Sequence, residues 1–440
     1  MKKLLLPLFI ASSLFNAQTS INVFSQIVFY DGYAANVSQP VPSNVIRLAN
    51  SRYARKLTDA ELNSFQNKIQ MNVTIGALCD NYDRIGGVHI ALVPKGQASY
   101  TMSDTQIKRF EIGRYITPFM NKNITPTEVP YTYEVNNLYS VFSNTVLRSA
   151  YDIWVELDVF GVPYAANTQV AGCANRNDVF AGTLTFVTSN DPAVSNTFNT
   201  VLPLLDSSTL NNYNNTDVTG QTVRLVNFNL TQTAGNPKFF IVTSPHGAGN
   251  NGEEYVRRQN LISLDNAQVM NFTPGGKSCE PYRMYNTQPN GIYGYNAQSA
   301  AWWTSWNNWC PGDSVPIRSF SVASLSAGNH TLKYEVPTAV FYGQSGEIVL
   351  SMYMQSQSQV LSVKDVSTTD VSIYPNPTTD YVMIKGEKKV KHVTVLSVDG
   401  RKIAETDQSK IDLSSYPAGT YLLNILLEGG TEFSHKIIKK

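Results

Sequence analysis

Charged residues are scarce in this chain, and their signs balance. Only 15% of the 440 residues are Asp, Glu, Lys or Arg, and the formal net charge is +1. Proteins that bind nucleic acid neutralise its phosphates with clustered lysines and arginines. The near-neutral balance therefore predicts no nucleic-acid partner.

The sequence also lacks the motifs of a metal centre or an activated nucleophile. Its five histidines, at positions 89, 246, 330, 392 and 435, form no His-x-His or His-Glu-x-x-His pattern. There is no Gly-x-Ser-x-Gly elbow and no Gly-rich phosphate-binding loop. We therefore expect no metal and no other cofactor, which leaves chemistry by carboxylate side chains.

Long apolar runs are missing beyond the first residues. The opening MKKLLLPLFIASSLFNAQTS has two lysines, an apolar stretch to Phe15 and the small residue Ala17 before Gln18. This order predicts a secretory signal peptide over residues 1–17. No later apolar run reaches the roughly 18 to 20 residues that span a bilayer. The exported product is expected to be soluble or held at the cell surface.

Cysteine is rare, with four residues in the whole chain: Cys79, Cys173, Cys279 and Cys310. In an exported protein an even number of cysteines favours disulfides over metal ligation. Spacing alone does not choose among the three possible pairings. We favour a bridge between Cys279 and Cys310.

Short runs that alternate in polarity, such as GTLTFVTS and TLKYEV, fill most of the chain and are separated by Gly, Asn and Pro. A period of two is typical of antiparallel strands. The segment TDAELNSFQNKI is the one clear helix candidate, because Thr58 and Glu61 form a capping-box pattern. The sequence therefore predicts an all-β protein of the sandwich or jelly-roll type.

The C-terminal residues differ from the rest. Residues 358–370 read as a linker, and from Val371 onward lysines cluster among about seven short strand patterns. YPNP, the central DGR and the basic end KIIKK resemble the sorting domain of type IX secretion cargo. The resemblance implies passage through the periplasm and outer membrane by that machinery, followed by release or attachment to the surface.

Two acidic clusters stand beside arginines, far apart in the sequence. CDNYDR places Asp80, Asp83 and Arg84 just before an apolar strand, and GEEYVRR places Glu253 and Glu254 after a Gly- and Asn-rich loop. One such cluster is usually a turn or a partly exposed ion pair, worth about 0 to 1 kcal/mol. Two clusters suggest a shared functional site.

Four of the five tryptophans lie within residues 302–309. No regular strand buries so many indoles at this spacing, so either some stack on sugar rings or they form a small core under a long loop. The residues are Trp302, Trp303, Trp306 and Trp309.

CDNYDR, FEIGRYITPF, SAYDIWVELDVFG, GEEYVRR and WNNWCPGDSVPIR resemble, in this order, the landmarks of the bacterial peptide-N-glycosidase F family. That family has two adjacent antiparallel jelly-roll sandwiches with the substrate cleft between them. It hydrolyses, without a metal, the amide that joins asparagine to the innermost N-acetylglucosamine. The implied organisation is a signal peptide at 1–17, jelly rolls at 18–177 and 178–357, a linker at 358–370 and a small β-sandwich sorting domain at 371–440.

The resemblance places the main catalytic acid on Asp83. Arg84 would keep it ionised as the water-activating base. Supporting carboxylates fall on Glu254 and on Asp152, where the family has a glutamate. Residues expected to contact the substrate are Arg84, Glu253 (the alternative to Glu254), Trp154, Trp302, Trp303, Trp306 and Trp309.

The chain departs from the family pattern around the site. Thr74 replaces a cysteine partner of Cys79, which then pairs with Cys173, whereas the Cys279 bridge matches the family. Two further cysteines are replaced by Gly252 and Val256, and an arginine by Trp306.

Two functions follow. The first is a secreted, monomeric amidase that acts on N-glycoproteins or glycopeptides. The alternative is a non-catalytic glycan-binding protein or surface adhesin on the same fold, which the changed cysteines and Trp306 favour.

Overall fold

The computed structural model describes residues 18–211, 222–247, 252–288, 293–341, 346–358, 371–386, 388–397, 402–428 and 432–440. The predicted signal peptide and residues 359–370 of the predicted linker lie outside these ranges. The chain divides into two compact units, of which the first ends at Ser358 and the second contains the C-terminal residues. Each unit is considered by itself.

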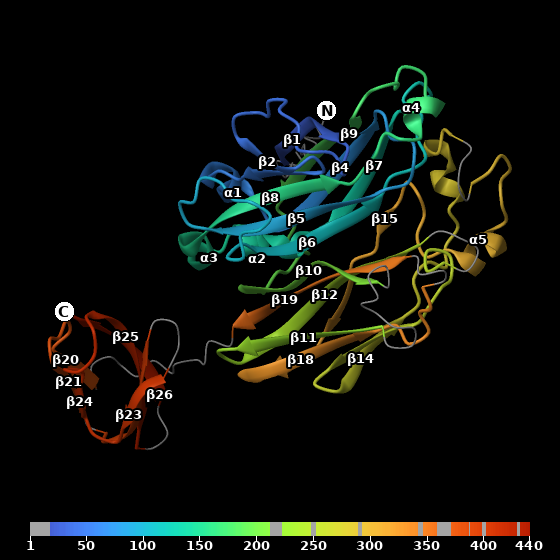
Figure 1. Ribbon diagram of the computed structural model, residues 1–440. Helices are drawn as coiled ribbons and strands as arrows, with labels where there is room; N and C mark the ends of the chain where they lie inside the picture. The colour runs from blue at the N-terminus through green and yellow to red at the C-terminus, as the bar shows by residue number, and fades with distance from the viewer. Residues whose placement is uncertain are drawn as a thin grey trace, which may run out of the picture. The chain divides into compact units, whose positions relative to one another are not determined.

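The first sandwich of unit 1 pairs two antiparallel sheets (Figure 1). In β4, Ile69, Met71, Val73 and Ile75 point into the core while the residues between them face outward, as a period of two requires. One sheet contains β1 (Thr19–Tyr30), β9 (Asp178–Ser189), β4 (Lys68–Ala77) and β7 (Glu128–Glu134). The other contains β15 (Ser314–Val315), β6 (Lys108–Ile116), β5 (Ile85–Pro94), β8 (Tyr151–Val159), β3 (Arg52–Lys56) and β2 (Val45–Ala49).

The second sandwich of unit 1 has a separate core around residues such as Phe239, Leu332 and Leu350. One sheet contains β10 (Thr200–Asn211), β19 (Glu347–Ser358), β12 (Ala234–His246), β16 (Arg318–Ser321) and β17 (Ser324–Leu325). The other contains β11 (Val223–Leu230), β18 (Gly328–Glu335), β13 (Asn260–Leu264) and β14 (Ala267–Phe272). The predicted double sandwich is confirmed.

The limit between the sandwiches lies later in the chain than residues 177/178. Strand β9, which begins at Asp178, pairs with β1 and β4 of the first sandwich, and the second begins with β10 at Thr200. The short β15 also returns to the first sandwich, where Ser314 pairs with Tyr115.

The predicted helix is correct at its start and wrong at its end. Helix α1 covers Asp59–Ser64, and the Thr58–Glu61 capping box is present. Phe65 then turns extended and packs on Phe142 and Phe186, so burial of this ring ends the helix. The other helices are η1 (Asn136–Leu138), α2 (Tyr139–Phe142), α3 (Thr145–Ala150), α4 (Ala166–Gln169), η2 (Glu280–Tyr285) and α5 (Ala300–Trp306). In the described ranges no helix is long and apolar enough to cross a membrane.

A buried ion pair joins the two sandwiches, which lie against each other in Figure 1. Arg114 and Glu111 of β6 are about 1% and 2% exposed and bond to each other at 2.6–2.8 Å. The Arg114 guanidinium also donates to Ser244 Oγ (2.9 Å) and to the Val349 carbonyl (2.7 Å) of the second sandwich. Nε and Nη2 thus hold Glu111 of the same strand, while the two bonds from Nη1 fix the position of one sandwich on the other.

A second buried polar group lies along the same joint. His89 Nδ1 is 2.7 Å from Asp206 Oδ1 of β10, and Arg52 binds both Glu156 (3.1 Å) and Asp158 (2.8 Å) of β8. Burial disfavours the charged imidazole, but the charge of Asp206 and the hydrogen bonds to Asp206 and Asp158 together outweigh it and raise the pKa of His89 to about 10. A cationic His89 therefore holds β10 to the first sandwich.

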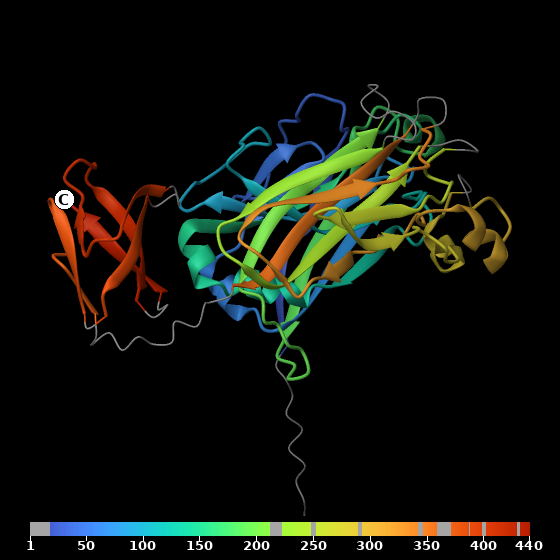
Figure 2. The ribbon, with the colours of Figure 1, turned by 90° about the horizontal axis from the view of Figure 1, so that it is seen from below.

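Figure 2 shows the same molecule from below, with α5 and its neighbouring loops at one end of unit 1, as in Figure 1. Unit 2 is a small β-sandwich with its own core, which includes Val393, Leu423 and Ile437. Its described part has the seven strands expected from the sequence: β20 (Val371–Tyr374), β21 (Tyr381–Gly386) and β24 (Lys410–Asp412) in one sheet, and β23 (Lys402–Thr406), β22 (Val390–Ser397), β25 (Gly419–Leu427) and β26 (Glu432–Lys439) in the other.

The buried ion pair between Glu111 and Arg114 leads to a prediction about stability. Arg114→Leu is expected to lower the free energy of unfolding by about 3–5 kcal/mol in urea denaturation, because Glu111 is left buried without a counter-charge. The double variant Glu111→Gln/Arg114→Leu should regain part of the loss. Lys68→Gln, which breaks the exposed pair with Asp191, is the control and should cost about 0–1 kcal/mol. A loss from Arg114→Leu no larger than this control would contradict the role of the joint.

Candidate active site

The CDNYDR segment, residues 79–84, connects β4 to β5 and is held by its own ion pair. Asp80 is 1% exposed and accepts hydrogen bonds from Arg84 Nε (2.6 Å), the Val162 amide (2.7 Å) and the Tyr82 amide (2.9 Å). The arginine that the sequence assigned to Asp83 is therefore bound to Asp80. Arg84 therefore fixes the turn that contains Asp83.

Two further contacts anchor this segment. A disulfide joins Cys79 to Cys173, which confirms the predicted pairing. Thr117, just after β6, accepts from the Arg84 amide at its Oγ1 (2.7 Å) and donates its own amide to the Arg84 carbonyl (2.8 Å). The segment is thus fixed at both ends.

Asp83 and Glu254, one from each sandwich, share an electrostatic environment. Burial and the charge of Glu254 raise the pKa of Asp83, and the lowering effect of Arg84 does not offset them. Burial also raises the pKa of Glu254, against the Tyr255 hydroxyl and the Gly247 amide that donate to it. The expectation that Arg84 keeps Asp83 ionised near neutral pH is therefore wrong. The two carboxylates form a coupled pair, here called the carboxylate pair.

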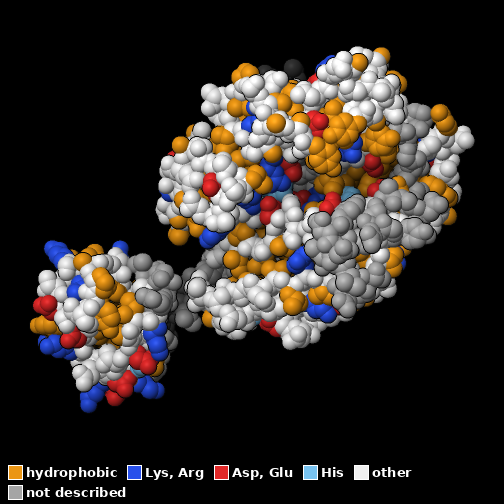
Figure 3. Space-filling view, viewed as in Figure 1, with side chains coloured by type: hydrophobic (Ala, Val, Ile, Leu, Met, Phe, Trp, Pro, Cys, Tyr) orange, Lys and Arg blue, Asp and Glu red, His pale blue; other side chains and the backbone are white. Residues whose placement is uncertain are grey.

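The surface is hollowed between the two sandwiches, and acidic, basic and histidine side chains gather in the hollow (Figure 3). Strand β5 begins at Ile85, two residues after Asp83, and pairs with β8 along its length. Charged groups that converge between two packed domains are where an active site is expected.

Glu253 is not available as a substitute for Glu254. Its carboxylate is fully buried and binds Arg258 through two bonds of 3.1–3.2 Å. It also accepts the Val340 and Phe341 amides at 2.8 and 3.2 Å. Its acceptor capacity is used inside the protein, so Glu253 orders the loop that carries Glu254.

Asn308 holds the Glu254 loop by its side chain. The amide nitrogen donates to the carbonyls of Glu253 (2.8 Å), Glu254 (2.8 Å) and Val256 (3.2 Å). The Val256 amide in turn donates to the Gly252 carbonyl at 3.1 Å. Hydrogen bonds therefore close the loop at the two positions where the family has cysteines.

The segment that carries Asn308 reaches both sandwiches. The predicted bridge between Cys279 and Cys310 is confirmed, and the Trp309 indole donates to the Pro245 carbonyl at 2.8 Å. Beyond it, the Gly312 amide donates to the Ile116 carbonyl (2.9 Å) next to Thr117. A continuous set of bonds thus links the Glu254 loop to the contacts of Arg84.

Three residues near the carboxylate pair were not identified from the sequence: His246, Tyr255 and Asn308. His246 Nε2 lies 2.7 Å from Ser244 Oγ, and burial together with Arg114 lowers its pKa to about 3, so the ring is neutral. Tyr255 follows Glu254 directly, and His246 precedes the Gly- and Asn-rich loop. For Tyr255 and His246, closeness in sequence to Glu253 and Glu254 was the signal that could have identified them.

Asp152 does not lie with the carboxylate pair. It is the second residue of β8 and pairs with Val93, whereas Val159 at the other end of β8 pairs with Gly86, three residues after Asp83. Seven residues of strand separate these pairs, or roughly 23 Å. Asp152 instead binds Lys56 and Lys95, so its assignment as a supporting catalytic acid is wrong.

The tryptophans are mostly core residues. Trp154 (4% exposed) packs on Tyr100, Trp303 (0%) donates to Glu280 at 2.8 Å, and Trp309 is 7% exposed. Trp302 is half-buried edge-on against Trp303, with ring centroids 4.7 Å apart. The Trp306 side chain lies outside the described residues. Binding of sugar by Trp154, Trp303 or Trp309 is excluded by their burial.

Removal of the Asn308 side-chain amide should make the loop that carries Glu254 more mobile. Asn308→Ala removes the side-chain donor of the Glu253, Glu254 and Val256 carbonyls and leaves the Glu254 carbonyl only the Asn308 backbone amide at 3.4 Å, for an expected loss of about 1–3 kcal/mol. In hydrogen exchange followed by mass spectrometry, the amides of Tyr255 and Val256 should exchange faster. Asn123→Ala, which removes one exposed bond to the Ala171 carbonyl, serves as the control. Unchanged exchange over residues 252–258 would show that Asn308 does not hold the loop.

Comparisons with known proteins agree with this architecture. Family models described as peptide-N-glycosidase F, N terminal and C terminal, match residues 20–175 and 212–355, and a secretion system C-terminal sorting domain matches residues 372–440. No curated protein matches the chain.

Two structures of PNGF-II, in P21 and C2 crystal forms, have TM-scores of 0.58 and 0.56 at 19% identity. The alignments cover 78% of this chain and 66% and 65% of PNGF-II, just under two thirds of its length. PNGase F, a glycosylasparaginase from Flavobacterium meningosepticum, has a TM-score of 0.49 at 14% identity over 78% of this chain and 96% of its own. At these identities the structural likeness shows the fold alone.

The sorting domain indicates secretion across the outer membrane or attachment to the surface. The two matched models account for both sandwiches, and the chain belongs to the peptide-N-glycosidase F family of glycoamidases.

Proposed function

We propose that the protein is a peptide-N-glycosidase that hydrolyses the amide between asparagine and the innermost N-acetylglucosamine of N-glycoproteins, giving aspartate and free glycan. The observation that carries the proposal is the coupling of Asp83 with Glu254 across the joint of a glycoamidase-family fold. Amide hydrolysis needs one group to accept a proton from water and another to donate a proton to the leaving nitrogen.

The carboxylate pair supplies both groups when it holds one proton. Two carboxylates that share a buried site do not both ionise at neutral pH. Glu254 has the Tyr255 hydroxyl and the Gly247 amide as donors, which favour its charged form. Burial raises the pKa of both groups, but Asp83 has a negative neighbour, Glu254, whose effect is larger than the opposing effect of Arg84, and this favours the protonated form of Asp83. The shared proton therefore belongs mainly to Asp83, in place of the base role expected from the sequence.

The reaction then balances within the pair. Water attacks the amide carbonyl carbon while Glu254 accepts one proton from it, and the C–N bond breaks as Asp83 donates its proton to the leaving nitrogen. The glycan leaves as a glycosylamine, which a second water converts to free glycan and ammonia in solution. The pair ends with one proton, as it began, so no cofactor is required. Fixing both loops by buried hydrogen bonds holds the two carboxyls in the orientation that this transfer needs.

The cellular context is part of the proposal. The type IX secretion machinery would export the chain through its sorting domain, and N-glycoproteins outside the cell would be its substrates. The predicted glycan-binding alternative loses support, because Trp303 and Trp309 are core residues.

The activity is tested with the full chain and a denatured N-glycoprotein, followed by mass spectrometry of the glycosylated peptide. We expect aspartate at the former glycosylation site, and Asp83→Asn to lower the rate by at least about 100-fold. Asp191→Asn, at an exposed ion pair with Lys68, is the matched control and should retain the rate. Recovery of only intact glycopeptide, with measurable glycan binding, would favour the binding protein over the amidase.

The coupling of the two carboxyls predicts a shift in titration. Glu254→Gln removes a negative charge beside Asp83, so the protonated form of Asp83 loses support and its pKa should fall toward the usual aspartate range. NMR titration of the Asp83 carboxyl in both proteins measures this directly. The exposed variant Glu128→Gln should leave the titration unchanged. Burial of Asp83 remains in this variant, so an Asp83 pKa that is unchanged in Glu254→Gln, rather than one that stays partly raised, would contradict the shared proton.

A further inference from the structure

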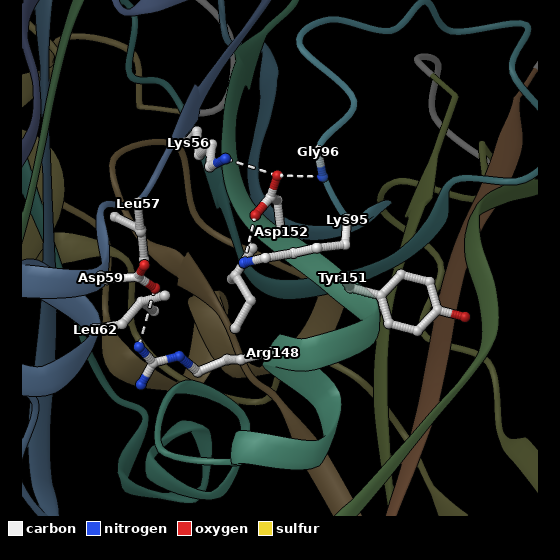
Figure 4. Close-up of a pocket in the computed structure, with 10 residues that line it drawn as sticks. Lys56, Leu57, Asp59, Leu62, Lys95, Gly96, Arg148, Tyr151 and Asp152 are labelled. Carbon is white, nitrogen blue, oxygen red and sulfur yellow. Dashed lines mark hydrogen bonds and ion pairs between the residues drawn. The ribbon is translucent and has the colours of Figure 1, made fainter.

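Buried polar groups of a folded chain normally find their partners inside it. The Asp152 carboxylate is typical, because it accepts from Lys56 at 2.6 Å and from Lys95 at 2.9 Å (Figure 4). His246 of β12 differs, because only its Nε2 has a partner among the described residues. The side chain is half-buried, and Nδ1 is not one of the described polar atoms that are both buried and unpartnered. One ring nitrogen of His246 is therefore free to meet a ligand.

The bonds of Ser244 decide which nitrogen of His246 carries the hydrogen. The Ser244 hydroxyl is buried, accepts from Arg114 Nη1 at 2.9 Å and lies 2.7 Å from His246 Nε2. A guanidinium only donates, so the hydroxyl hydrogen of Ser244 has Nε2 as its acceptor in the described part of the chain. Because the ring is neutral, the hydrogen of the imidazole is then assigned to Nδ1. His246 thus presents a neutral Nδ1–H donor.

The imidazole faces the first sandwich in a fixed orientation. Ser244, two residues earlier on β12, bonds to Arg114 of β6, and residues two apart on a strand share a face. The His246 ring packs on Trp309, with ring centroids 5.3 Å apart. The Trp309 indole is itself held by the carbonyl of Pro245. Contacts at Nε2 and at the ring face therefore fix the direction of the free donor.

The residue after His246 is bonded to Glu254 of the carboxylate pair. The Gly247 amide donates to the Glu254 carboxylate, and the Gly247 carbonyl accepts from the Glu254 amide at 3.4 Å. The neutral donor and the carboxylate that accepts a proton from water are therefore tied to one backbone segment.

One further titratable side chain shares the face of His246. Glu347 of β19 is its direct partner across the sheet. Burial raises the pKa of Glu347, and the opposing effect of Arg114 is smaller, which favours the uncharged carboxyl. In that form Glu347 does not repel a ligand oxygen that becomes negative.

We propose that His246 is a catalytic residue, whose Nδ1–H donates to the oxygen of the amide carbonyl that water attacks. This inference rests on the proposed function. As water adds, the carbonyl oxygen takes up negative charge, and a fixed donor stabilises that charge. Glu254 and Asp83 only accept and donate protons, so the donor on the oxygen has to be another group. A neutral imidazole suits this position, because it donates a hydrogen bond without being a stronger acid than Asp83.

Two variants separate the two nitrogens of the ring. In His246→Gln the side-chain amide reaches the position of Nε2, so the bond with Ser244 is kept and the donor at Nδ1 is lost. In His246→Asn the amide lies at the position of Nδ1, so a donor is kept there. We expect His246→Gln to lower kcat on an N-glycopeptide by about 100- to 1,000-fold with KM nearly unchanged, because this bond is strongest in the transition state. His246→Asn should lose less than about tenfold.

His392→Gln is the matched control, because this histidine lies in the sorting domain and is bound to Asp407. It should leave kcat and KM unchanged. Thermal unfolding of each variant verifies that the fold is kept.

NMR of the imidazole nitrogens tests the donor without any turnover, in the full chain with isotope-labelled histidine. We expect His246 in the neutral Nδ1–H form at neutral pH. Its Nδ1–H resonance should shift when the N-glycopeptide is added to the Asp83→Asn variant, which leaves the peptide uncleaved.

A ring in the Nε2–H form, or a charged ring at neutral pH, overturns the proposal. So does a kcat that is unchanged in His246→Gln, or one that falls equally in both folded His246 variants. If the unmodified protein cleaves the glycopeptide and His246→Gln cleaves it equally well, the role of His246 fails and the amidase stands. If the unmodified protein cleaves nothing, the amidase fails and the catalytic role of His246 fails with it, and the Nδ1–H shift then shows whether the ring still contacts the ligand.

Discussion

One buried arginine, Arg114, fixes how the two sandwiches of unit 1 lie on each other. Asp83 and Glu254 come from different sandwiches, so they meet only if the two sandwiches keep one relative position. Arg114 spans that joint, bound to Glu111 on one side and to Ser244 and Val349 on the other. A buried ion pair costs desolvation and adds little net stability, but its directional bonds penalise every other register. We infer that orientation, more than stability, is what this pair contributes.

The electrostatics of the site follow from the same joint. Closing the sandwiches on each other removes water around Asp83 and brings Glu254 near it, and both effects raise the Asp83 pKa. The arginine next in sequence does not reverse this, because Asp80 holds it. A carboxyl that keeps its proton in this way is suited to donate it to a leaving nitrogen. The Arg114 guanidinium at the joint also lowers the pKa of His246 and so helps to keep that ring neutral.

Much of this was predictable from sequence, in proportion to how local each feature is. Period-two patterns predicted the strands, and the Thr58 and Glu61 pattern predicted the helix start. Two acidic clusters beside arginines indicated the segments that carry Asp83 and Glu254, and the family resemblance selected these two residues within them. Asp152 was misassigned because its neighbours in sequence do not reveal which end of β8 it occupies, and strand direction in a sheet decides that. Trp303 and Trp309 were open to either interpretation, since only packing tells a buried indole from an exposed one. Neither Asn308 nor its three carbonyl partners form a local pattern, so its role emerges only from the folded chain.

The two disulfides anchor the segments that carry the site residues. Cys79–Cys173 and Cys279–Cys310 close segments of 94 and 31 residues, and bridges of this span stabilise a fold by about 3–5 kcal/mol each. Neither bridge closes the turn at Asp83 or the loop at Glu254 directly. The turn is held by Asp80 with Arg84, and the loop by Asn308 and by Glu253 with Arg258. Covalent bonds thus anchor the segments that carry the site, while hydrogen bonds set the orientation of the two carboxyls. The cysteines missing from the site loops therefore need not cost the protein its chemistry, because the geometry that they would enforce is supplied by buried polar side chains.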